Sequence, residues 1–359
     1  MLQLQKISLF QFKNYSQKDF FFNKNIIAIA GANGTGKTNL LDAVYFLCFT
    51  KSYFNRDVQV VQHNQHGVRI EGCFLKNNLP QTLAAIIRED NKKEFLVDDE
   101  EYKKFSEHIG KFPCVMVAPD DISLINNNSD ERRKFIDTIL SQINSSYLQN
   151  LIAYNKILLQ RNSLLKQAHD EHLLDELLFE AINKQLIEKG EYIFIERKNF
   201  LAKLFPLVQA AYSQIAKKDD NINITYESHL LNKPFNQLLK ENRQRDIVLQ
   251  RTSSGIHKDE INISINQQPF KSVASQGQKK SLLFALKLAE FTVIKQHKGF
   301  SPILLLDDIF EKLDDDRMHQ LLNKVCVQEQ AQVFITDTHQ NRLEQALAKL
   351  SLSFQIINL

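Results

Sequence analysis

Apolar and polar residues alternate at the start of the chain and predict a region rich in strands. The alternation over 2–15 predicts an edge strand. The apolar run at 26–30 ends at glycine, which is typical of a buried strand that enters a turn. A helix is predicted over 40–49, where few positions are polar. A meander of three short strands follows, over 68–75, 83–88 and 94–97, with a turn near Asn77, Asn78 and Pro80.

The pattern changes after Pro119. From residue 120 to 205 there is no proline and only one glycine, Gly190. The stretches 131–167 and 172–204 place Leu and Ile among Lys, Glu and Gln at helical spacing, which predicts several long helices. Beyond them the pattern predicts strands at 222–227 and 259–265, a helix at 278–296, a strand at 302–306, a helix at 315–326 and a strand at 331–336.

These elements predict an α/β fold with an inserted helical lobe. The chain has 359 residues, which corresponds to about two domains at roughly 150 residues each. We expect one domain to be built from residues 1–118 and 250–359. The lobe, residues 119–249, is expected between its two halves.

Composition narrows the class of protein. Hydrophobic residues make up 43% and charged residues 24%, which excludes a wholly disordered or fibrous chain. A net charge of +3 neither requires nor excludes a nucleic-acid partner, so any basic surface must come from local patches. The four cysteines form no C-x-x-C pair and predict buried thiols in a reducing compartment. Without a signal-peptide core or about 18 consecutive apolar residues, we expect a soluble, cytoplasmic protein with no membrane partner.

Residues 31–38 match the phosphate-loop pattern G-x-x-x-x-G-K-[ST] at every fixed position. An apolar strand precedes them and a helix follows, so backbone N–H groups can point at phosphate oxygens near the start of a helix. Lys37 would reach the β and γ phosphates, and the Thr38 hydroxyl would hold Mg²⁺. The alternative is a glycine-rich turn that happens to carry Lys and Thr.

Two carboxylates end a strongly apolar segment, where Asp307 and Asp308 follow 302–306. Carboxylates at the end of a buried strand are unfavourable unless a cation or hydrogen bonds compensate their charge. Mg²⁺ beside the phosphate loop would supply that charge, with Asp307 facing the metal. Asp308 would position or deprotonate the attacking water. The alternative is that both residues only cap the segment that follows.

The sequence Ser275-Gln276-Gly277-Gln278-Lys279 opens the helix predicted at 278–296. Alone, it is satisfied by an ordinary N-cap at Ser275. Its place between the phosphate loop and the acidic strand end resembles the ABC-type ATPases of the SMC and RecF group. The resemblance implies an ATPase head in which serine and glycine bind the γ-phosphate held by a second subunit. The candidate nucleotide-binding residues are Gly31, Ala32, Asn33, Gly34, Thr35, Gly36, Lys37, Thr38, Asn39, Ser275, Gly277 and Gln278.

Further segments resemble the RecF family within that group, and together the resemblance runs from residue 1 to about 340. They are Phe12-Lys13-Asn14-Tyr15 (F-R-N-Y in the family), residues 31–39 (G-x-N-G-x-G-K-T-N), residues 132–137 (R-R-x-F-L-D), residues 255–259 (G-P-H-R/K-D, with Ile replacing Pro) and Glu311-Lys312-Leu313-Asp314 (the D-loop). The segments at 132 and 255 distinguish RecF proteins from other SMC-like ATPases.

Three departures from the family pattern stand out. No Gln for a Q-loop is found near 115–118. His339 is displaced from the end of the last strand, so Thr336 and Asp337 are candidates for the switch role. Asp308 replaces the usual Glu, and the shorter carboxylate fits slow hydrolysis that times DNA binding.

The resemblance implies that Mg²⁺ and ATP drive homodimerisation on DNA. It also implies that weak ATP hydrolysis, with Lys37 and Asp308 as catalytic residues, releases the dimer from DNA. The role would be to mark gaps or junctions and, with RecO and RecR, to help load RecA during repair and replication restart. Binding to the backbone of duplex or junction DNA without sequence reading is expected. The candidate DNA contacts are Lys51, Arg56, Arg132 and Arg133. His257 and Lys258 fit either a phosphate contact or a structural turn.

Three rival functions remain open. A structural SMC-type chromosome protein would need sustained coiled-coil heptads, which 119–249 lacks. An ABC-type ATPase subunit of a transporter would ignore DNA, and the segments at 12 and 132 disfavour it. A small-molecule kinase would act as a monomer and would leave the Ser275 signature without a role.

Overall fold

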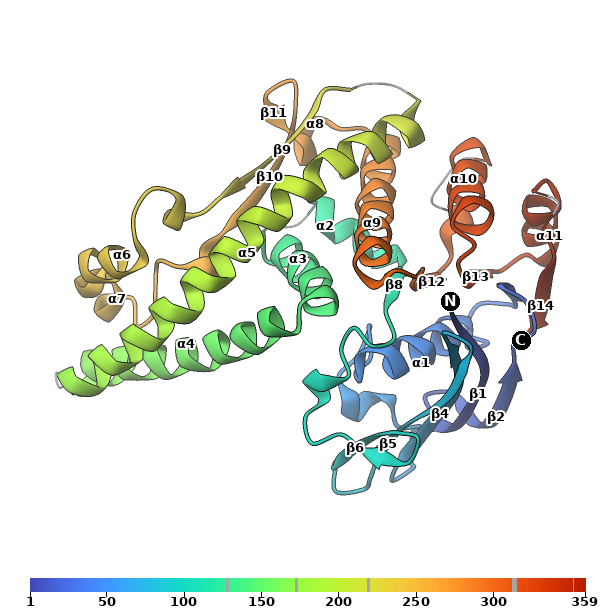
Figure 1. Cartoon of the computed structure of the whole chain (residues 1–359), viewed down its shortest axis with the longest axis horizontal. Coiled ribbons are helices and arrows are strands. Elements are labelled where there is room, and N and C mark those ends of the chain that lie inside the picture. Colours follow the sequence, from blue (N-terminus) through green and yellow to red (C-terminus); the bar gives the residue numbers. More distant parts are fainter. Residues whose placement is uncertain (127–128, 172–173, 218–219, 312–314, 351) are drawn as a thin grey trace. The chain divides into compact units, whose positions relative to one another are not determined.

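The computed structural model describes residues 1–126, 129–171, 174–217, 220–311, 315–350 and 352–359. The chain divides into two compact units (Figure 1). Unit 1 comprises Met1–Ile122, Ala210–Lys218 and Ser275–Leu359, and unit 2 comprises Ser123–Gln209 and Asp219–Ala274. The expected boundary at 250 differs from this division, because residues 250–274 lie in unit 2.

Unit 1 contains a five-stranded parallel sheet. Its order is β14 (Phe354–Asn358), β3 (Ile26–Ala30), β13 (Val333–Asp337), β12 (Ile303–Leu306) and β8 (Cys114–Val117). Every residue of β3, β8, β12 and β13 is buried, as expected of parallel strands covered on both faces. The carboxyl ends of β3, β12 and β13 therefore lie along one edge of the sheet.

The second sheet of unit 1 is antiparallel. Its order is β2 (Tyr15–Phe21), β1 (Leu2–Phe12), β4 (Val68–Lys76), β5 (Leu79–Ile87), β6 (Lys93–Val97) and β7 (Glu100–Glu101). The prediction that β1 is an edge strand is wrong, because β1 pairs with both β2 and β4. Its alternation reflects one buried face and not an edge position. Asn77 and Asn78, with φ of 51° and 65°, form the tight turn between β4 and β5.

Helix α1 (Lys37–Phe49) packs against strands of both sheets, which explains why it is apolar on nearly every side. The remaining regular segments of unit 1 are η1 (Asp57–Val60), η2 (Phe105–Glu107), η3 (Pro119–Ile122), α9 (Gln276–Lys298), η6 (Ile309–Glu311), α10 (Asp315–Leu322), the π-helix η7 (Asn323–Gln328) and α11 (Gln340–Ala348). In the part of the chain that is described, no helix has both the length and the apolar character to cross a membrane.

Unit 2 is mainly helical but also contains a sheet. Its helices are α2 (Ser123–Asn126), α3 (Ser129–Ile143), α4 (Ser145–Glu171), α5 (Glu176–Ala216, whose last seven residues belong to unit 1), η4 (His229–Leu231), α6 (Phe235–Glu241), α7 (Arg243–Val248), η5 (Ile256–Lys258) and α8 (Phe270–Val273). Strand β10 (Glu260–Ile265) pairs with β9 (Ile222–Glu227) and β11 (Gln268–Pro269). Because of this pairing, the strand predicted at 259–265 lies in unit 2 and not in unit 1.

The long stretch predicted at 131–167 is two helices with a break at Asn144. The Asn144 side chain accepts a hydrogen bond from the Tyr147 backbone N–H at 3.0 Å, so Asn144 caps the start of α4. Helix α5 runs for 41 residues and contains Pro206. Gly190 on α5 leaves room for the Phe235 ring of α6, whose Cε1 would lie 2.6 Å from a Cβ at this position.

Candidate functional site

The loop between β3 and α1 needs glycine at its last position. Gly36 has a φ of 110°, in the left-handed region that favours glycine. A Cβ there would lie 2.6 Å from Asn14 Nδ2 and 2.7 Å from the Tyr15 hydroxyl oxygen. The N-cap residue Gly36 makes no side-chain cap hydrogen bond to the start of α1, and a helix start of this kind favours an anion.

Lys37 closes this loop on itself. Its Nζ donates hydrogen bonds to the backbone oxygens of Gly31 at 2.8 Å and Ala32 at 3.0 Å. Lys37 is buried, with 5% of its surface exposed. The ammonium is therefore held at the loop, where phosphate oxygens could replace the two carbonyl acceptors.

Thr38 and Asp307 lie together although they come from opposite ends of the sequence. The Thr38 hydroxyl lies 2.9 and 3.1 Å from the two carboxylate oxygens of Asp307. The Thr336 hydroxyl at the end of β13 donates to Asp307 Oδ1 at 2.8 Å and accepts from the Asp308 backbone N–H at 2.9 Å. Burial raises the pKa of Asp307, while the hydrogen bonds from Thr336 and Thr38 act in the opposite direction.

The Thr38 and Asp307 oxygens fit a Mg²⁺ ion. Mg²⁺ prefers oxygen ligands and commonly takes only one or two from the protein, leaving the rest to water and phosphate. Among the described residues, no group of three or more His, Cys, Asp and Glu side chains could hold a metal ion. A Mg²⁺ ion held by Thr38 and Asp307 would take its remaining ligands from water and phosphate.

The Phe12-Lys13-Asn14-Tyr15 segment supports the loop from outside. The Asn14 Nδ2 donates to the Thr35 backbone oxygen at 3.0 Å, and the Tyr15 hydroxyl donates to the Gly36 oxygen at 3.1 Å. Asn39 on α1 donates to Asn14 Oδ1 at 2.8 Å. In the sequence this segment carried only a family resemblance, and its contacts with the loop give it a physical role.

The same segment is anchored to α1 by an ion pair. Lys13 Nζ lies 2.7 Å from Asp42 Oδ2 on the first half of that helix, and Asp42 is fully buried. Asn14 and Tyr15 are therefore held beside the loop by their neighbour in the sequence.

The Ser275 segment begins α9 as a capping box. Ser275 Oγ accepts from the Gln278 backbone N–H at 3.2 Å, and Gln278 Oε1 accepts from the Ser275 N–H at 2.8 Å. The Ser275 hydroxyl hydrogen is not used by either bond. Arg317 of α10 lies close to this helix start, because a Cβ at Gly277 would be 3.1 Å from Arg317 Nη1. Sequence reasoning did not single out Arg317.

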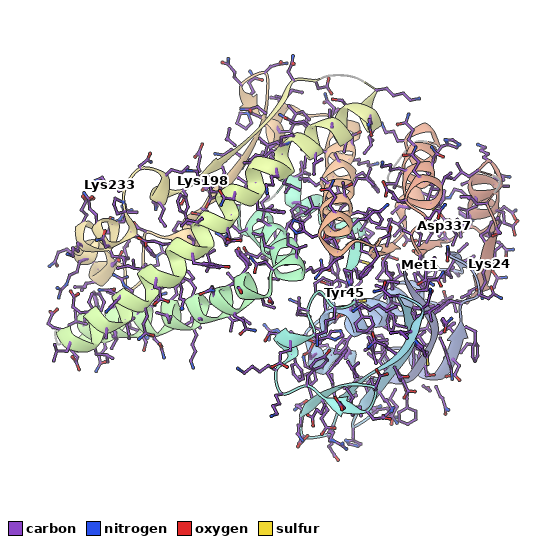
Figure 2. All side chains as sticks on the ribbon, viewed as in Figure 1. Met1, Lys24, Tyr45, Lys198, Lys233 and Asp337 are labelled. Atoms are coloured by element: carbon purple, nitrogen blue, oxygen red, sulfur yellow. The ribbon has the colours of Figure 1, made fainter. Side chains whose placement is uncertain are left out.

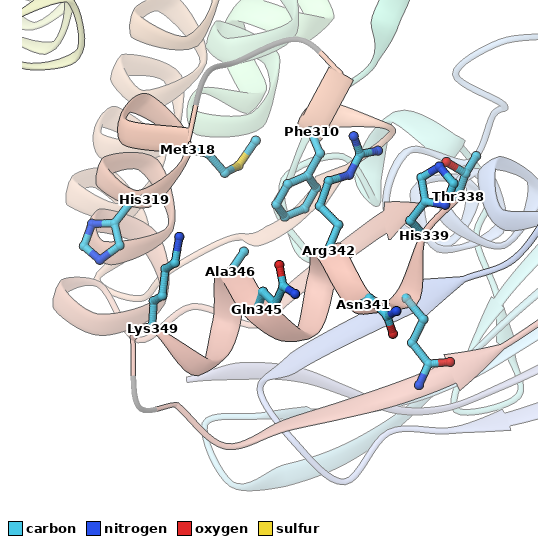
Figure 3. Close-up of a pocket in the computed structure, with 11 residues that line it drawn as sticks. Phe310, Met318, His319, Thr338, His339, Asn341, Arg342, Gln345, Ala346 and Lys349 are labelled. Carbon is cyan, nitrogen blue, oxygen red and sulfur yellow. The ribbon is translucent and has the colours of Figure 1, made fainter.

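The switch candidates at the end of β13 have separate surroundings. Asp337 is buried and forms an ion pair with Arg342 at 2.7 Å, and its Oδ1 accepts from the His339 N–H at 2.7 Å. His339 lines a pocket of about 640 Å³ between α10 and α11, together with Phe310 and Arg342 (Figure 3). Residues 312–314 of the expected D-loop lie outside the described residues.

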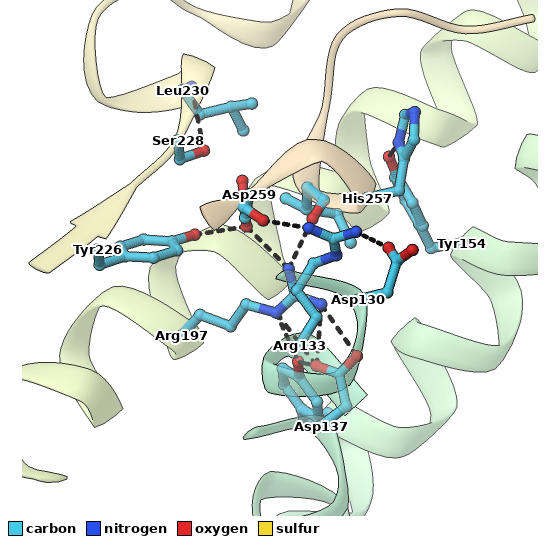
Figure 4. A network of polar contacts seen from close by, with 12 residues as sticks. Asp130, Arg133, Asp137, Tyr154, Arg197, Tyr226, Ser228, Leu230, His257 and Asp259 are labelled. Atoms are coloured by element: carbon cyan, nitrogen blue, oxygen red, sulfur yellow. Dashed lines mark hydrogen bonds and ion pairs between the residues drawn. The ribbon is translucent and has the colours of Figure 1, made fainter. Parts of the chain in front are cut away.

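In unit 2, the segments at 132–137 and 255–259 meet at one buried arginine (Figure 4). Arg197 of α5 donates to Asp137 Oδ1 and Oδ2 at 2.9 and 3.0 Å, to Asp259 Oδ2 at 2.8 Å and to the Ile256 oxygen at 2.7 Å. Burial alone would lower the pKa of Arg197, but the neighbouring Tyr147, Asp137 and Asp259 hold it well above its ordinary value.

His257 belongs to the same structural core. Burial lowers its pKa to about 4, so the ring is neutral at pH 7. Its Nε2 lies 3.0 Å from the Thr252 carbonyl oxygen, which can only accept, so Nε2 carries the proton. Its Nδ1 then accepts from the Tyr154 hydroxyl at 2.8 Å. These contacts favour the structural turn for His257.

The basic residues proposed to contact DNA divide between the two units. Lys51 and Arg56 are exposed in the loop after α1. Arg133 is largely buried, with its guanidinium bonded to the Asp259 oxygen and to Asp130. Arg132 and the exposed Lys258 line a pocket of about 520 Å³ in unit 2 that also contains Arg133, Lys271, Asp130 and Glu260.

Comparisons with known proteins identify the same family as the sequence motifs. Residues 3–356 match the family described as RecF/RecN/SMC N terminal domain. A Flavobacterium johnsoniae protein named DNA replication and repair protein RecF is 41% identical over 359 residues, covering 100% of both chains. A Cytophaga hutchinsonii protein of that name is 41% identical over 342 residues, covering 95% of this chain and 90% of the relative.

Solved structures with a similar fold include members of the same family. Structures of the recombination mediator protein RecF with ATP and with ATPrS match at TM-scores of 0.87 and 0.86 and 29% identity, covering 94% of this chain and 92% and 93% of theirs. An Smc head domain from Pyrococcus furiosus, 18% identical with a TM-score of 0.54, covers 96% of this chain and 91% of its own and shares the fold. With a full-length match to the family model and full-length relatives at 41% identity, the chain belongs to the RecF family, and its fold is that of an ABC/SMC-type ATPase head with an inserted lobe.

Proposed function

We propose that this chain is an ATP-dependent DNA-binding recombination mediator that dimerises on gapped or junction DNA. The observation that carries the proposal is the pair formed by Thr38 and Asp307, at 2.9 Å, beside the loop that Lys37 closes. That arrangement presents backbone N–H groups, one ammonium and two metal-ligating side chains to a single phosphate chain.

In the proposed reaction, the loop amides and Lys37 bind the phosphates of ATP. Thr38 and Asp307 would hold Mg²⁺, which neutralises phosphate charge when bound. Asp308 accepts a proton from, or orients, the water that attacks the γ-phosphorus, giving ADP and phosphate. The Asp308 backbone is fixed by Thr336 at 2.9 Å, but its carboxylate is shorter than the usual Glu, which supports slow turnover.

A second copy of the chain would complete the site. Ser275 Oγ already accepts the Gln278 N–H, so its own hydroxyl hydrogen can be donated to a γ-phosphate oxygen held by the partner. Gly277 and the nearby Arg317 lie at the same helix start. Because anions bind favourably at helix N-termini, ATP would hold two heads together.

DNA would be bound through phosphates and not through bases. Lys51, Arg56 and Arg132 are the candidate contacts in this proposal, and Lys258 is added because it lines a pocket with Arg132. Arg133 is the weakest candidate, since its guanidinium already has partners within unit 2. The relatives are named for DNA replication and repair, and the similar solved structures are of a recombination mediator in the RecFOR pathway. The pathway named for those structures supports RecO and RecR as partners, and help in loading RecA is part of the proposal.

Sedimentation of the full chain tests the proposal. The protein is measured alone, with Mg²⁺ and ATP, and with both plus a gapped DNA duplex. A dimer that forms only with ATP and becomes tighter on the gapped duplex is expected. A monomer under every condition would overturn the proposal, and an ATP-dependent dimer indifferent to DNA would favour an ABC-type subunit.

A further inference from the structure

A buried ionic cluster in unit 1 connects α9 to two other parts of the head. Its members are Tyr53, Asp121, Lys287 and Glu290, here called the brace cluster. Lys287 Nζ lies 3.3 Å from Asp121 Oδ2 and 3.7 Å from Glu290 Oε2. The Tyr53 hydroxyl donates a hydrogen bond to Asp121. Asp121, Lys287 and Glu290 are 7%, 6% and 3% exposed, so the charges are shielded from solvent.

The cluster continues into the helix that carries the phosphate loop. Asp42 on α1 accepts from the Tyr53 backbone N–H at 2.7 Å and from the Ser52 hydroxyl at 2.6 Å. Its other partner is Lys13, beside the residues that support the loop. Polar contacts therefore run from the loop support through Asp42 and Tyr53 to Lys287 on α9, the helix that begins just after Ser275.

Two of the cluster's elements also adjoin places where the chain passes between units. The chain first leaves unit 1 after Ile122 and, after the short passage Ala210–Lys218, returns for the last time at Ser275. Asp121 precedes the exit, and its Oδ2 accepts from the Ala118 N–H at 2.8 Å, which fixes η3. This is the part of the sequence in which no Q-loop glutamine was found. Lys287 therefore holds the exit segment against the returning helix.

Stability alone does not account for such a cluster. Burying three charged groups is unfavourable unless each is well paired, and apolar side chains of similar volume would often be at least as stable. Glu290 Oε2 has no hydrogen-bond partner among the described residues. Buried polar groups of this kind can instead specify one arrangement of the elements they join.

Glu290 can change its charge near neutral pH. The pKa of Glu290 is raised to about 7, because the effect of burial outweighs the opposing effect of the Lys287 ammonium. The titratable and charged groups that face it from the packed elements are Lys287 on α9, Asp121 on η3, Cys114 on β8 and Tyr45 on α1, with Tyr53 beyond Asp121. A neutral Glu290 leaves the Lys287 ammonium to Asp121, and an ionised Glu290 competes for it.

We propose that the brace cluster positions α9, and with it Ser275 and Gly277, for binding to a second head, and that Glu290 sets how firmly Lys287 holds Asp121. Lys287, Asp121 and Glu290 are positioning residues in this account and do not touch nucleotide. The inference rests on the proposed function and deepens it, because it names what regulates the dimer contact.

The experiment compares the full chain with Lys287→Met and with Lys298→Met, the same substitution in the last turn of α9 and outside the cluster. Affinity for a fluorescent ATP analogue, ATP-dependent dimerisation, and hydrogen exchange across α9 are measured. Lys287→Met is expected to bind nucleotide within about twofold of the wild type, to dimerise at least about tenfold more weakly and to exchange faster along α9. Lys298→Met is expected to match the wild type in all three.

A second variant, Glu290→Gln, keeps the side-chain shape and removes the charge. Wild-type dimerisation is expected to weaken several-fold from pH 6 to pH 8, and Glu290→Gln to keep its pH 6 affinity throughout. The inference would be overturned if dimerisation of Glu290→Gln weakened with pH as the wild type does. It would also be overturned if Lys287→Met dimerised and exchanged along α9 like the wild type. If Lys287→Met does not fold, the pH profile of Glu290→Gln decides alone.

The two proposals fail in different ways. If the wild type does not dimerise with ATP, the proposed function is wrong. Hydrogen exchange along α9 then still tests whether the brace cluster positions this helix. Faster exchange in Lys287→Met, together with pH-dependent exchange that Glu290→Gln abolishes, would support it. Exchange equal to that of the wild type in both variants would overturn it.

Discussion

The Thr38 hydroxyl and the Asp307 carboxylate are 269 residues apart in the sequence and 2.9 Å apart in the structure. The parallel sheet explains their proximity, because β3 and β12 are separated only by β13 and run in the same direction. Residues that follow the carboxyl ends of such strands meet at one edge of the sheet. The roles of this edge and of the residues that support it can be tested one side chain at a time.

Replacing Lys37 by Ala should remove most of the affinity for ATP. A hydrogen bond to a charged group contributes about 1.5–3 kcal/mol, so a loss of roughly ten- to a hundredfold or more is expected. Titration calorimetry with ATP measures it. The control is Lys24→Ala, an exposed lysine just before β3 (Figure 2). Unchanged affinity in Lys37→Ala would remove the phosphate-loop assignment.

Replacing Ser275 by Arg should separate nucleotide binding from dimerisation. The long cation fills the helix start, where the partner's γ-phosphate is proposed to bind, while residues 31–39 are untouched. Sedimentation with ATP should give a monomer, and calorimetry should give wild-type ATP affinity. A Ser275→Arg protein that still dimerises with ATP would show that the segment only caps α9.

Replacing Asp308 by Asn should slow ATP hydrolysis and prolong the ATP-bound dimer on DNA. The amide keeps the shape of the side chain but cannot accept the proton of water. Phosphate release should fall by about a hundredfold or more, because a positioned general base typically contributes about 10²–10⁴-fold. Dissociation from gapped DNA, followed by fluorescence anisotropy, should slow in parallel. Normal turnover in Asp308→Asn would mean that another group is the base.

Replacing Arg197 by Met should destabilise unit 2. Removing one partner of a buried ion pair leaves the other charges uncompensated and typically costs about 3–5 kcal/mol. Here Asp137 and Asp259 would both lose Arg197 as their ion-pair partner. Thermal unfolding should move to lower temperature, whereas Lys198→Met, an exposed neighbour on α5, should leave it unchanged (Figure 2). Equal midpoints for the two variants would contradict this account of the cluster.

Stability should also depend on pH through Glu290. Its pKa is about 7 in the folded state against an ordinary 4.5. A group with a raised folded pKa contributes stability that is fully present below its unfolded pKa and is lost as pH rises through the folded one. One pKa unit corresponds to about 1.4 kcal/mol. Glu290→Gln should therefore unfold at a higher temperature than the wild type at pH 8 and at nearly the same temperature at pH 5, measured by scanning calorimetry.

Local patterns in the sequence carried much of the fold. The phosphate-loop pattern, the N-cap at Ser275 and most strands follow from short-range rules of backbone geometry and burial, which depend on neighbouring residues alone. The wrong predictions concern strands whose position depends on which other strands they pair with. Strand β1 looked like an edge strand, and β10 was placed with the wrong unit, because alternation shows which face is buried but not which strand lies alongside.

The sequence by itself determined which chemistry can be proposed for the site, since residue types and their spacing predict a phosphate loop, candidate metal ligands and a helix-start signature. Only the tertiary structure decided which distant side chains act together. It placed Asn14 and Tyr15 against the loop, joined Asp137 and Asp259 through Arg197, and buried Lys287 between Asp121 and Glu290. Such contacts arise from the packing of whole elements, and no local pattern encodes them.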